Sequence, residues 1–258
     1  MEFLGTLLNE SDKFMLVLSR FAGLLLAPIY STRNLPAIWK AALALFLAFL
    51  GWQAGLPGSY QVPAGVGAYV LVIFSEVLVG FSIALTAQFF FAAIQLAGQV
   101  LDTQMGFGIT NVIDPLSGTQ APLLGNFKYI IAILVFLQVD GHHYLLKAFF
   151  DSYDAVPIGQ AAVTAGLMEY LFHYFGNIFV IGMKLAIPIL GTVLITDIIL
   201  GVMSRVVPQM NIFMVGMPAK ILVGFGVMLV IMPLYIYLLN ALIAGMIQEI
   251  YQIIDVLV

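Results

Sequence analysis

Four ionisable side chains interrupt long apolar runs of this sequence, and they are its strongest candidates for chemistry. They are Arg20, Glu76, Lys184 and Asp197. Each would cost roughly 2.5–3.5 kcal/mol at the centre of a bilayer, so each is expected to face protein, water or a partner charge. Two interpretations stay open: the charges tie helices together, or Glu76, Lys184 and Asp197 relay protons or ions. Asp197, Gly201 and Arg205 recur at four-residue spacing on one helical face, which predicts a local electrostatic tie there.

A second polar group contains two adjacent histidines. His142 and His143 would point about 100° apart on a helix, so they are not expected to face one metal ion. Asp140 and His143 offer two ligands, which is too few for a structural metal site. The sequence therefore predicts no metal site here and an interfacial polar cluster instead. The other members of that cluster are Lys147, Asp151 and Asp154.

Motifs of the common enzyme classes are missing from the sequence. No glycine-rich loop ends in Gly-Lys, as a phosphate-binding loop requires, and no Gly-x-Ser-x-Gly elbow is present. Gly106-Phe107-Gly108 lacks the preceding strand and the third glycine of a dinucleotide-binding turn. The lack of cysteine excludes disulfides, thiolate metal sites, iron–sulfur clusters and cysteine nucleophiles. We therefore predict a non-enzymatic protein without a cofactor.

Composition places most of the chain in apolar surroundings. Of its 258 residues, 62% are apolar and 9% are charged, and the mean hydropathy is +1.09. A soluble domain has roughly 45–50% apolar and about 25% charged residues, so a water-soluble fold could not bury this much apolar surface. The net charge of −4 and the pI near 5.2 leave no basic stripe for a nucleic acid. The predicted surroundings are membrane lipid and other apolar helices.

Apolar runs close to membrane length predict an all-α, polytopic membrane-type protein. Crossing a hydrocarbon core of roughly 30 Å takes about 20 helical residues. Six segments approach that length: residues 14–30, 41–56, 69–97, 129–139 with 144–150 behind it, 170–203 and 221–247. The loops after the first and before the last segment carry Arg33, Lys40, Arg205 and Lys220. With six spans these basic loops share one side, so the positive-inside bias predicts both termini outside the cytoplasm.

Two stretches rich in glycine and proline break these runs. Residues 98–126 contain five glycines and two prolines, and residues 201–226 are similarly punctuated. Such stretches form loops or broken helices, and non-helical backbone at membrane depth survives only inside protein or beside a water-filled cavity. Phe107 stands between two glycines, which gives a bulky apolar side chain to a loop that is free to move. It would form a hydrophobic constriction that excludes water and ions, or a buried residue of a tight turn.

Small residues four apart predict close contacts between helices. Such pairs occur at Ala44/Ala48, Ala93/Ala97 and Ala241/Gly245. In lipid, no hydrophobic force draws helices together, so small side chains that let two backbones approach are typical of contact faces. We expect these positions to be packed against neighbouring helices.

Both punctuated stretches carry motifs that resemble a known family. The first holds Ala97-Gly98-Gln99, Gln104-Met105-Gly106-Phe107 and Asp114-Pro115, and Gly141-His142-His143 and Val156-Pro157-Ile158-Gly159 extend the match. The second is more specific and runs through Leu200-Gly201, Arg205-Val206-Val207-Pro208-Gln209-Met210-Asn211-Ile212-Phe213 and Gly216-Met217-Pro218. On these motifs the sequence resembles the FliR family of flagellar export-gate proteins, which is related to the T component of injectisome type III secretion systems. One departure is Gln99, where members of the family often have glutamate.

The resemblance implies a subunit of a channel. Proteins of this family join FliP and FliQ in a helical, ring-like gate in the bacterial inner (cytoplasmic) membrane at the flagellar basal body, with FlhB wrapped around it and FlhA below. Unfolded flagellar export substrates would pass through this gate. The implied fold is a FliP-like part over residues 1–165, followed by a FliQ-like helical hairpin over residues 166–258. Many helices of such a gate stand above the lipid plane, which would explain segments of uneven length.

The resemblance also implies two groups of site residues. The loop at residues 105–112 corresponds to the loop that plugs the closed pore. Its residues are Met105, Gly106, Phe107, Gly108, Ile109, Thr110 and Asn111. Residues of the second motif are expected to contact neighbouring subunits, namely Arg205, Pro208, Gln209 and Asn211.

Two other functions stay open on the residues alone. A secondary transporter of a small solute would use Glu76, Lys184 and Asp197 as its relay. Such proteins usually show two similar halves with interrupted helices at corresponding positions, whereas the two broken stretches here differ in sequence. A passive membrane scaffold is also compatible with the composition.

Overall fold

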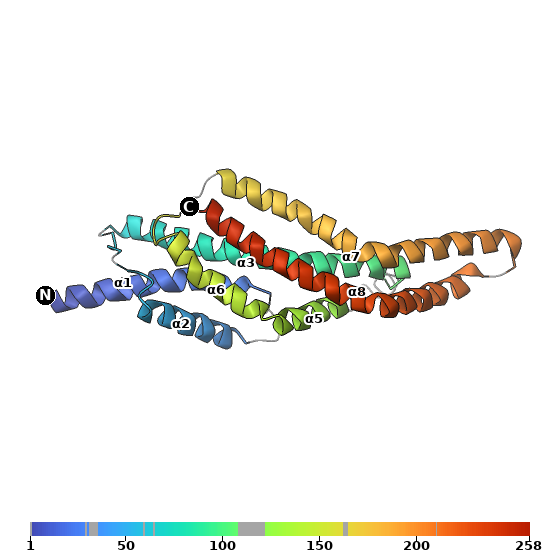
Figure 1. Ribbon diagram of the computed structural model, residues 1–258, viewed down its shortest axis with the longest axis horizontal. Coiled ribbons are helices and arrows are strands. Elements are labelled where there is room, and N and C mark those ends of the chain that lie inside the picture. The colour runs from blue at the N-terminus through green and yellow to red at the C-terminus, as the bar shows by residue number, and fades with distance from the viewer. Residues whose placement is uncertain are drawn as a thin grey trace. The chain divides into compact units, whose positions relative to one another are not determined.

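The part of the chain that the structure describes is all-helical (Figure 1). The computed structural model describes every residue except 1, 29, 31–35, 59, 64, 108–121, 162–164 and 210. The helices are α1 (Glu2–Ala22), the 3-10 helix η1 (Gly23–Leu26), α2 (Ala37–Gln53), α3 (Val66–Met105), α5 (Leu123–Gln138), α6 (Gly141–Ala155), α7 (Ala165–Val206) and α8 (Ile212–Val256). The predicted all-α class is confirmed over these residues, whereas the FliP-like and FliQ-like parts stay a prediction.

The first punctuated stretch becomes non-helical later than expected, at Gly106. α3 continues to Met105 and ends there because Gly106 adopts the left-handed conformation, with φ 92°. The N–H of Gly106 donates to the carbonyl of Thr103 at 3.3 Å. The N–H of Phe107 donates to the carbonyl of Asp102 at 2.9 Å, which completes the Schellman arrangement of a helix end.

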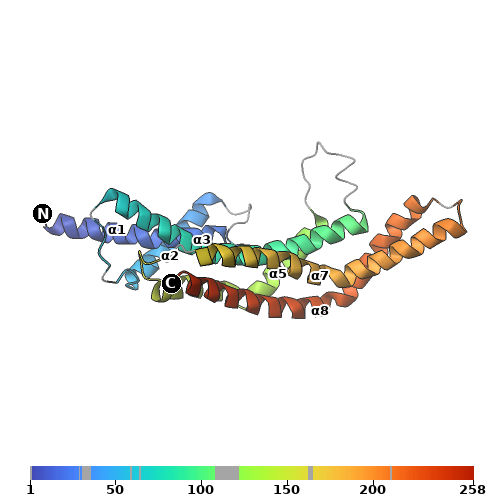
Figure 2. The ribbon, with the colours of Figure 1, turned by 90° about the horizontal axis from the view of Figure 1, so that it is seen from above.

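The second punctuated stretch is mostly helical. α7 and α8 have 42 and 45 residues, and only residues 207–211 separate them (Figure 2). Pro188 lies inside α7, and Pro218 and Pro233 lie inside α8. Proline removes one backbone hydrogen bond, and apolar helices tolerate this where neighbouring groups satisfy the freed carbonyl.

Three of the described helices are long and apolar enough to cross a membrane. They are α3, α7 and α8, and α5 with α6 would add a fourth if this pair, bent by 68°, counts as one span. The prediction of six spans is therefore wrong. The segment at 14–30 falls mostly in α1, which carries five charged residues, and the segment at 41–56 falls in α2, which has only 17 residues. The prediction that both termini share one side depended on six spans and loses its basis.

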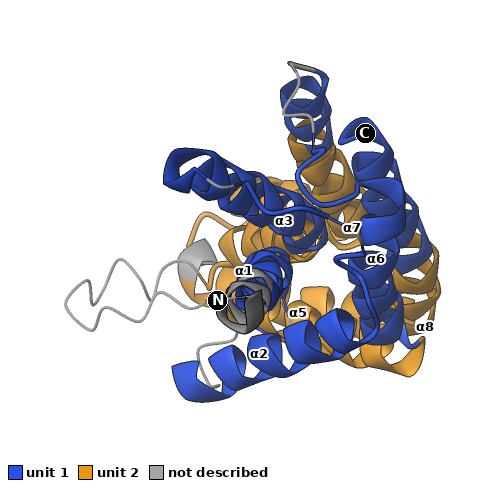
Figure 3. Ribbon diagram, turned by 90° about the vertical axis from the view of Figure 1, so that its left-hand side faces the viewer, with its two compact units in different colours: residues 1–89, 140–174, 243–258 blue, residues 90–139, 175–242 orange. Residues whose placement is uncertain are grey.

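The helices form two compact units, coloured separately in Figure 3. Unit 1 comprises residues 1–89, 140–174 and 243–258, and unit 2 comprises residues 90–139 and 175–242. Each unit therefore contains one part of α3, one part of α7 and one part of α8. The division at residues 165 and 166 implied by the family resemblance groups the chain differently and stays a prediction.

In unit 1, two backbones approach at Gly23 and Gly80. A Cβ atom on Gly80 would overlap the carbonyl of Arg20, and one on Gly23 would overlap the backbone of Gly80. The neighbouring Phe21 is fully buried and stacks on Phe149 of α6, with ring centroids 5.9 Å apart. Glycine is required at this contact because no side chain fits between the two backbones.

Unit 2 has a comparable contact between α3 and α5. A Cβ atom on Gly98 would overlap the backbone of Gly125, and one on Gly182 of α7 would lie 2.9 Å from the carbonyl oxygen of Ala93. The end of α3 is thus packed backbone to backbone against both α5 and α7.

The small-residue pairs predicted from the sequence are packed in two cases of three. Ala44/Ala48 and Ala93/Ala97 are buried, whereas Ala241 is exposed and nothing lies within 4 Å of a Cβ atom on Gly245. Spacing alone does not show which face of a helix meets a neighbour, because both kinds of pair have the same four-residue interval.

Replacing Gly80 with alanine is expected to lower the free energy of unfolding by about 1–3 kcal/mol, because a methyl group in a closed contact forces the backbones apart. Gly67 is the matched control, since it lies in the same helix with open space around a Cβ position. Alanine there is expected to be neutral or slightly stabilising. Thermal unfolding in detergent, followed by circular dichroism, measures both variants. Equal midpoints would contradict the close contact.

Candidate functional site

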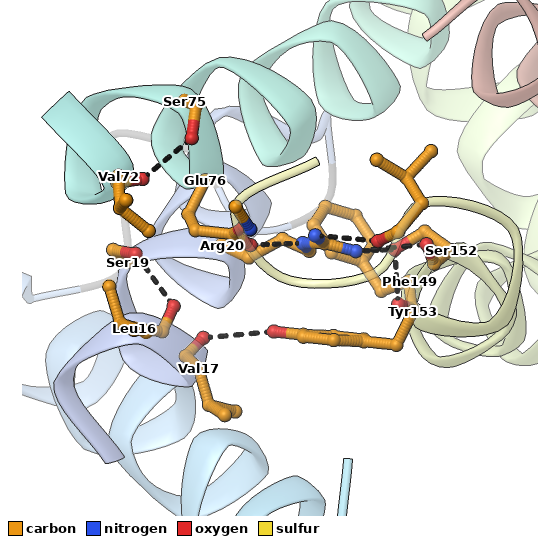
Figure 4. A network of polar contacts seen from close by, with 12 residues as sticks. Leu16, Val17, Ser19, Arg20, Val72, Ser75, Glu76, Phe149, Ser152 and Tyr153 are labelled. Atoms are coloured by element: carbon orange, nitrogen blue, oxygen red, sulfur yellow. Dashed lines mark hydrogen bonds and ion pairs between the residues drawn. The ribbon is translucent and has the colours of Figure 1, made fainter. Parts of the chain in front are cut away.

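Arg20 and Glu76 form a buried ion pair in unit 1 (Figure 4). Nε of Arg20 donates to Oε2 of Glu76 at 2.7 Å, and both side chains are 0% exposed. The last turn of α1 supplies Arg20, and α3 supplies Glu76. Loss of either residue would leave an unpaired charge among apolar side chains, so the two residues require each other.

The remaining donors of Arg20 reach α6 and the segment after it. Nη1 donates to the carbonyl and the hydroxyl of Ser152 at 2.9 and 3.2 Å, and Nη2 donates to the carbonyl of Val156 at 2.9 Å. The second oxygen of Glu76 accepts the N–H of Gly159 at 3.0 Å. Because these contacts join α1, α3 and α6, the geometry supports the interpretation that this charge pair ties helices together.

Tyr60 lies beside this network, in the segment between α2 and α3. A Cβ atom on Gly159, whose φ is 74°, would lie 2.7 Å from the Tyr60 hydroxyl oxygen. Burial raises the pKa of the Tyr60 phenol, and the nearby Glu76 carboxylate raises it further. The phenol therefore stays protonated near neutral pH and adds no charge to the network.

The other two predicted charges, Lys184 and Asp197, lie in unit 2 and do not converge. Asp197 pairs with Lys220 of α8, so the predicted tie to Arg205 is wrong. Lys184 is exposed and forms no ion pair among the described residues. The 13 residues from Lys184 to Asp197 span about 20 Å along α7. Since Glu76 is enclosed in its own pair, neither unit assembles the predicted relay.

Asp140, His142 and His143 lie closer together than predicted. The ring centroids of the two histidines are 4.0 Å apart, and Nδ1 of His143 lies 3.2 Å from Oδ1 of Asp140. One ligand atom from each residue lies within 4.8 Å of the others. The expectation that both histidines cannot face one ion is therefore wrong, because ring rotation brings the nitrogens together although the Cβ atoms diverge. Asp140 and His143 are exposed, and no fourth ligand joins them within the described chain.

Asp102 forms hydrogen bonds at both ends of the connection between α3 and α5. Its side-chain carboxylate accepts the N–H groups of Leu124 and Gly125 at 3.0–3.2 Å. Its backbone carbonyl accepts the N–H of Phe107. Pro122 precedes α5 and has no side-chain oxygen, so Asp102 caps that helix from α3. The carboxylate also complements the positive end of the α5 dipole.

The first residues of the predicted plug loop pack against α8. Met105 is 1% exposed, and a Cβ atom on Gly224 would overlap its side chain. The ring of Phe107 meets Phe225 edge to face, with centroids 6.1 Å apart. Phe107 thus belongs to the turn that ends α3 and contacts α8. The remaining predicted loop residues, Gly108, Ile109, Thr110 and Asn111, lie outside the described residues.

The four predicted subunit-contact residues lie in the connection between α7 and α8 or in the last turn of α7. Arg205, Pro208, Gln209 and Asn211 are all exposed. Oδ1 of Asn211 also accepts the N–H of Met214 at 3.4 Å, which marks the start of α8. Val206 and Met214 beside them are 71% and 75% exposed. This end of the helix pair therefore presents apolar and polar groups together.

Residues 12–246 match the family described as Bacterial export proteins, family 1. The flagellar biosynthetic protein FliR of Bacillus subtilis (strain 168) is 35% identical over 234 residues, which cover 89% of this chain and 89% of that protein. FliR of Escherichia coli (strain K12) is 32% identical over 208 residues, 81% of this chain and 79% of that protein. The chain belongs to the FliR family.

The sequence also predicted a relationship to the T component of type III secretion systems, and one relative tests it. Yop proteins translocation protein T of Yersinia pestis is 26% identical over 211 residues, 80% of this chain and 80% of that protein. The relationship of this FliR-family chain to the T component is therefore confirmed.

Three charged residues of this FliR-family chain make contacts that the sequence did not predict. They are Asp102, Lys128 and Lys220. Lys128 directly precedes the apolar run at 129–139, which suggests a flanking charge, yet it is 2% exposed. The usable signal was helical spacing, because Leu124, Lys128 and Ala132 recur at four-residue intervals on the buried face of α5.

Replacing Arg20 with methionine is expected to cost roughly 3–5 kcal/mol of unfolding free energy, because Glu76 then stays buried without its counter-charge. A second variant that also carries Glu76→Leu is expected to recover part of this loss. Lys147→Met is the control, since Lys147 is exposed on α6. Denaturant unfolding of the three variants in detergent provides the measurement. A loss no larger than that of Lys147→Met would show that the pair is not a structural tie.

Proposed function

We propose that this chain is a non-enzymatic subunit of the flagellar type III protein export gate. With FliP and FliQ it would form a channel that conducts unfolded flagellar substrates across the inner membrane at the basal body, with FlhB and FlhA as further partners. The observation that carries the proposal is membership of the FliR family over residues 12–246.

Exposed apolar surface supports a role as a subunit. Only 17% of the most apolar window of α8 is buried within the chain, compared with 44% of that of α3. On α8, the side chains of Leu222, Val230 and Tyr237 are 74%, 81% and 71% exposed. Large exposed apolar surfaces mark contacts with proteins or with membrane. α8 therefore needs cover from lipid or partner helices, which membership of a gate would supply.

The proposal includes a pore plug at residues 105–112. The contacts at the beginning of this segment support the role. Asp102 bonds the end of α3 to the start of α5, and Met105 and Phe107 pack on α8. A loop with fixed ends can close a pore without losing its position. Phe107 would supply the apolar side chain that excludes water and ions.

The exposed end of the α7–α8 pair supports the proposed subunit contacts. Arg205, Pro208, Gln209 and Asn211 are exposed beside exposed apolar neighbours, a mixture typical of the cores and rims of protein interfaces. Near this end, an ion pair between Lys220 of α8 and Asp197 of α7 links the two helices that carry the contact residues.

Co-expression with FliP- and FliQ-type partners tests the proposed function. We expect this chain to enter one discrete particle, detected by native mass spectrometry of the detergent extract. Arg205→Glu together with Gln209→Glu is expected to reduce the particle at least tenfold, because two new negative charges oppose an interface formed around a cation. Lys147→Glu, an exposed change on α6, should leave the yield unchanged. A chain that stays monomeric and transports a small solute into liposomes alone would refute the proposal.

Deleting residues 107–112 is expected to raise ion leak through cells that express the gate, because the apolar stopper is removed. Replacing Gly106 with valine is expected to act in the same direction, since φ 92° is strained for a β-branched residue. Membrane conductance and export of a flagellar substrate are the two measurements. Unchanged leak together with unchanged export would refute the plug and leave the proposed subunit role intact.

A further inference from the structure

Lys128 of α5 is a buried cation in unit 2. It is 2% exposed, and its Nζ donates to the carbonyl oxygen of Leu185 at 3.3 Å. The ammonium lies 4.8 Å from the centroid of the Tyr235 ring. Among the residues that the structure describes, no carboxylate lies within ion-pair distance of it. In this it differs from Arg20 and Lys220, which both have an acidic partner.

The two contacts of Lys128 solvate the ammonium but leave its charge uncompensated. A carbonyl dipole and an aromatic face each stabilise a cation, and neither carries a negative charge. A buried ammonium normally has an anionic partner, because desolvation of an unpaired charge is costly.

A small cavity lies beside Lys128, between α7 and α8. Lys128, Tyr235 and Pro188 line it together with aliphatic and methionine side chains of the two long helices, and its volume is about 20 Å³. Tyr235 is itself buried, and its hydroxyl has no hydrogen-bond partner among the described residues. The cavity therefore offers one cation and one unused hydroxyl in otherwise apolar walls.

We propose that Lys128 is the counter-charge for a carboxylate that a partner polypeptide inserts beside α7 and α8. A carboxylate has two oxygens, so one accepts from the Lys128 ammonium and the other from the Tyr235 hydroxyl. The inference rests on the proposed function, which supplies partners with apolar helices. It adds a defined polar contact within an apolar interface.

The size of the cavity argues for the end of a side chain as the occupant. A site of about 20 Å³ holds a group of only a few atoms, such as a carboxylate, since a single water already needs roughly 10–15 Å³. Small-molecule sites have about 300–1,000 Å³, so a free solute does not fit. A side chain presented by a packed helix brings its carboxylate without the bulk of a separate molecule.

Half-buried side chains of α7 and α8 edge the cavity. Pro188 and Ile231 line it and are half-buried. Val230 and Tyr237, which are 81% and 71% exposed, lie on the opposite face of α8 from the cavity-lining Tyr235, because each helical residue turns the chain by about 100°. A partner segment would therefore approach past Pro188 and Ile231, where the single buried cation would fix its register.

Lys128→Met tests the proposal, with Lys147→Met as the matched control on an exposed lysine. Each full chain is expressed alone and with FliP- and FliQ-type partners in parallel. We expect Lys128→Met to reduce the discrete particle at least tenfold, because the carboxylate of the partner is left unpaired. The isolated chain with Lys128→Met is expected to unfold at or above the midpoint of the unchanged chain, because a buried charge has been removed. Lys128→Glu should also block assembly, and a lysine at the matching acidic position of the partner should restore it.

Each result separates this inference from the proposed function. If the unchanged chain forms no particle, the proposed function fails and this inference falls with it. If the unchanged chain and Lys147→Met assemble and Lys128→Met assembles equally well, only this inference is overturned. A lower unfolding midpoint of the isolated Lys128→Met chain would assign the lysine an internal role and also overturn it. Loss of a bound phospholipid from the native mass spectrum of Lys128→Met, with the particle intact, would identify a lipid phosphate instead.

Discussion

Charge buried among apolar helices has to be compensated by groups that reach it there, and the tertiary structure depends on this constraint. In unit 1 a single guanidinium, that of Arg20, joins three helices because its planar fork reaches a carboxylate, a hydroxyl and two carbonyl groups at once. Glu76 uses its second oxygen on a backbone N–H, so the pair leaves neither carboxylate oxygen idle. Asp102 in unit 2 is compensated differently, by the N–H groups that begin α5.

Glycine makes these compensations possible by letting backbones approach. Gly23 and Gly80 bring the end of α1 against α3 within one turn of Arg20, and Gly98 and Gly125 bring α3 against α5 beside Asp102. In each unit a close backbone contact therefore lies next to a buried polar tie. A side chain at the contact would separate the helices and stretch the hydrogen bonds that neutralise the charge.

Of the three long helices, α8 is the most apolar and the least buried. α8 is buried over a smaller share of its apolar window than α3, and large side chains such as Val230 stand open along it. Membership of the FliR family and the proposed place in an export gate explain this exposed surface, since helices of other subunits or lipid would cover it. The same reasoning applies to Lys128, which has no carboxylate partner among the described residues, because the proposed assembly would supply one.

The sequence by itself determined the apolar helical class, the two punctuated stretches, the need of Arg20, Glu76 and Asp197 for partners, and the family motifs. Composition and residue type are enough for this, because the cost of exposing apolar surface or burying charge does not depend on the path of the chain. The number of long spans was wrong, because α1 carries five charged residues, α2 has only 17 residues, and α5 and α6 are two short helices bent by 68°. The sequence also could not predict which charged residues form ion pairs with each other. Arg20 and Glu76 are 56 residues apart, and Asp197 meets Lys220 instead of Arg205, because ion pairs follow distances in space that only the packed helices fix.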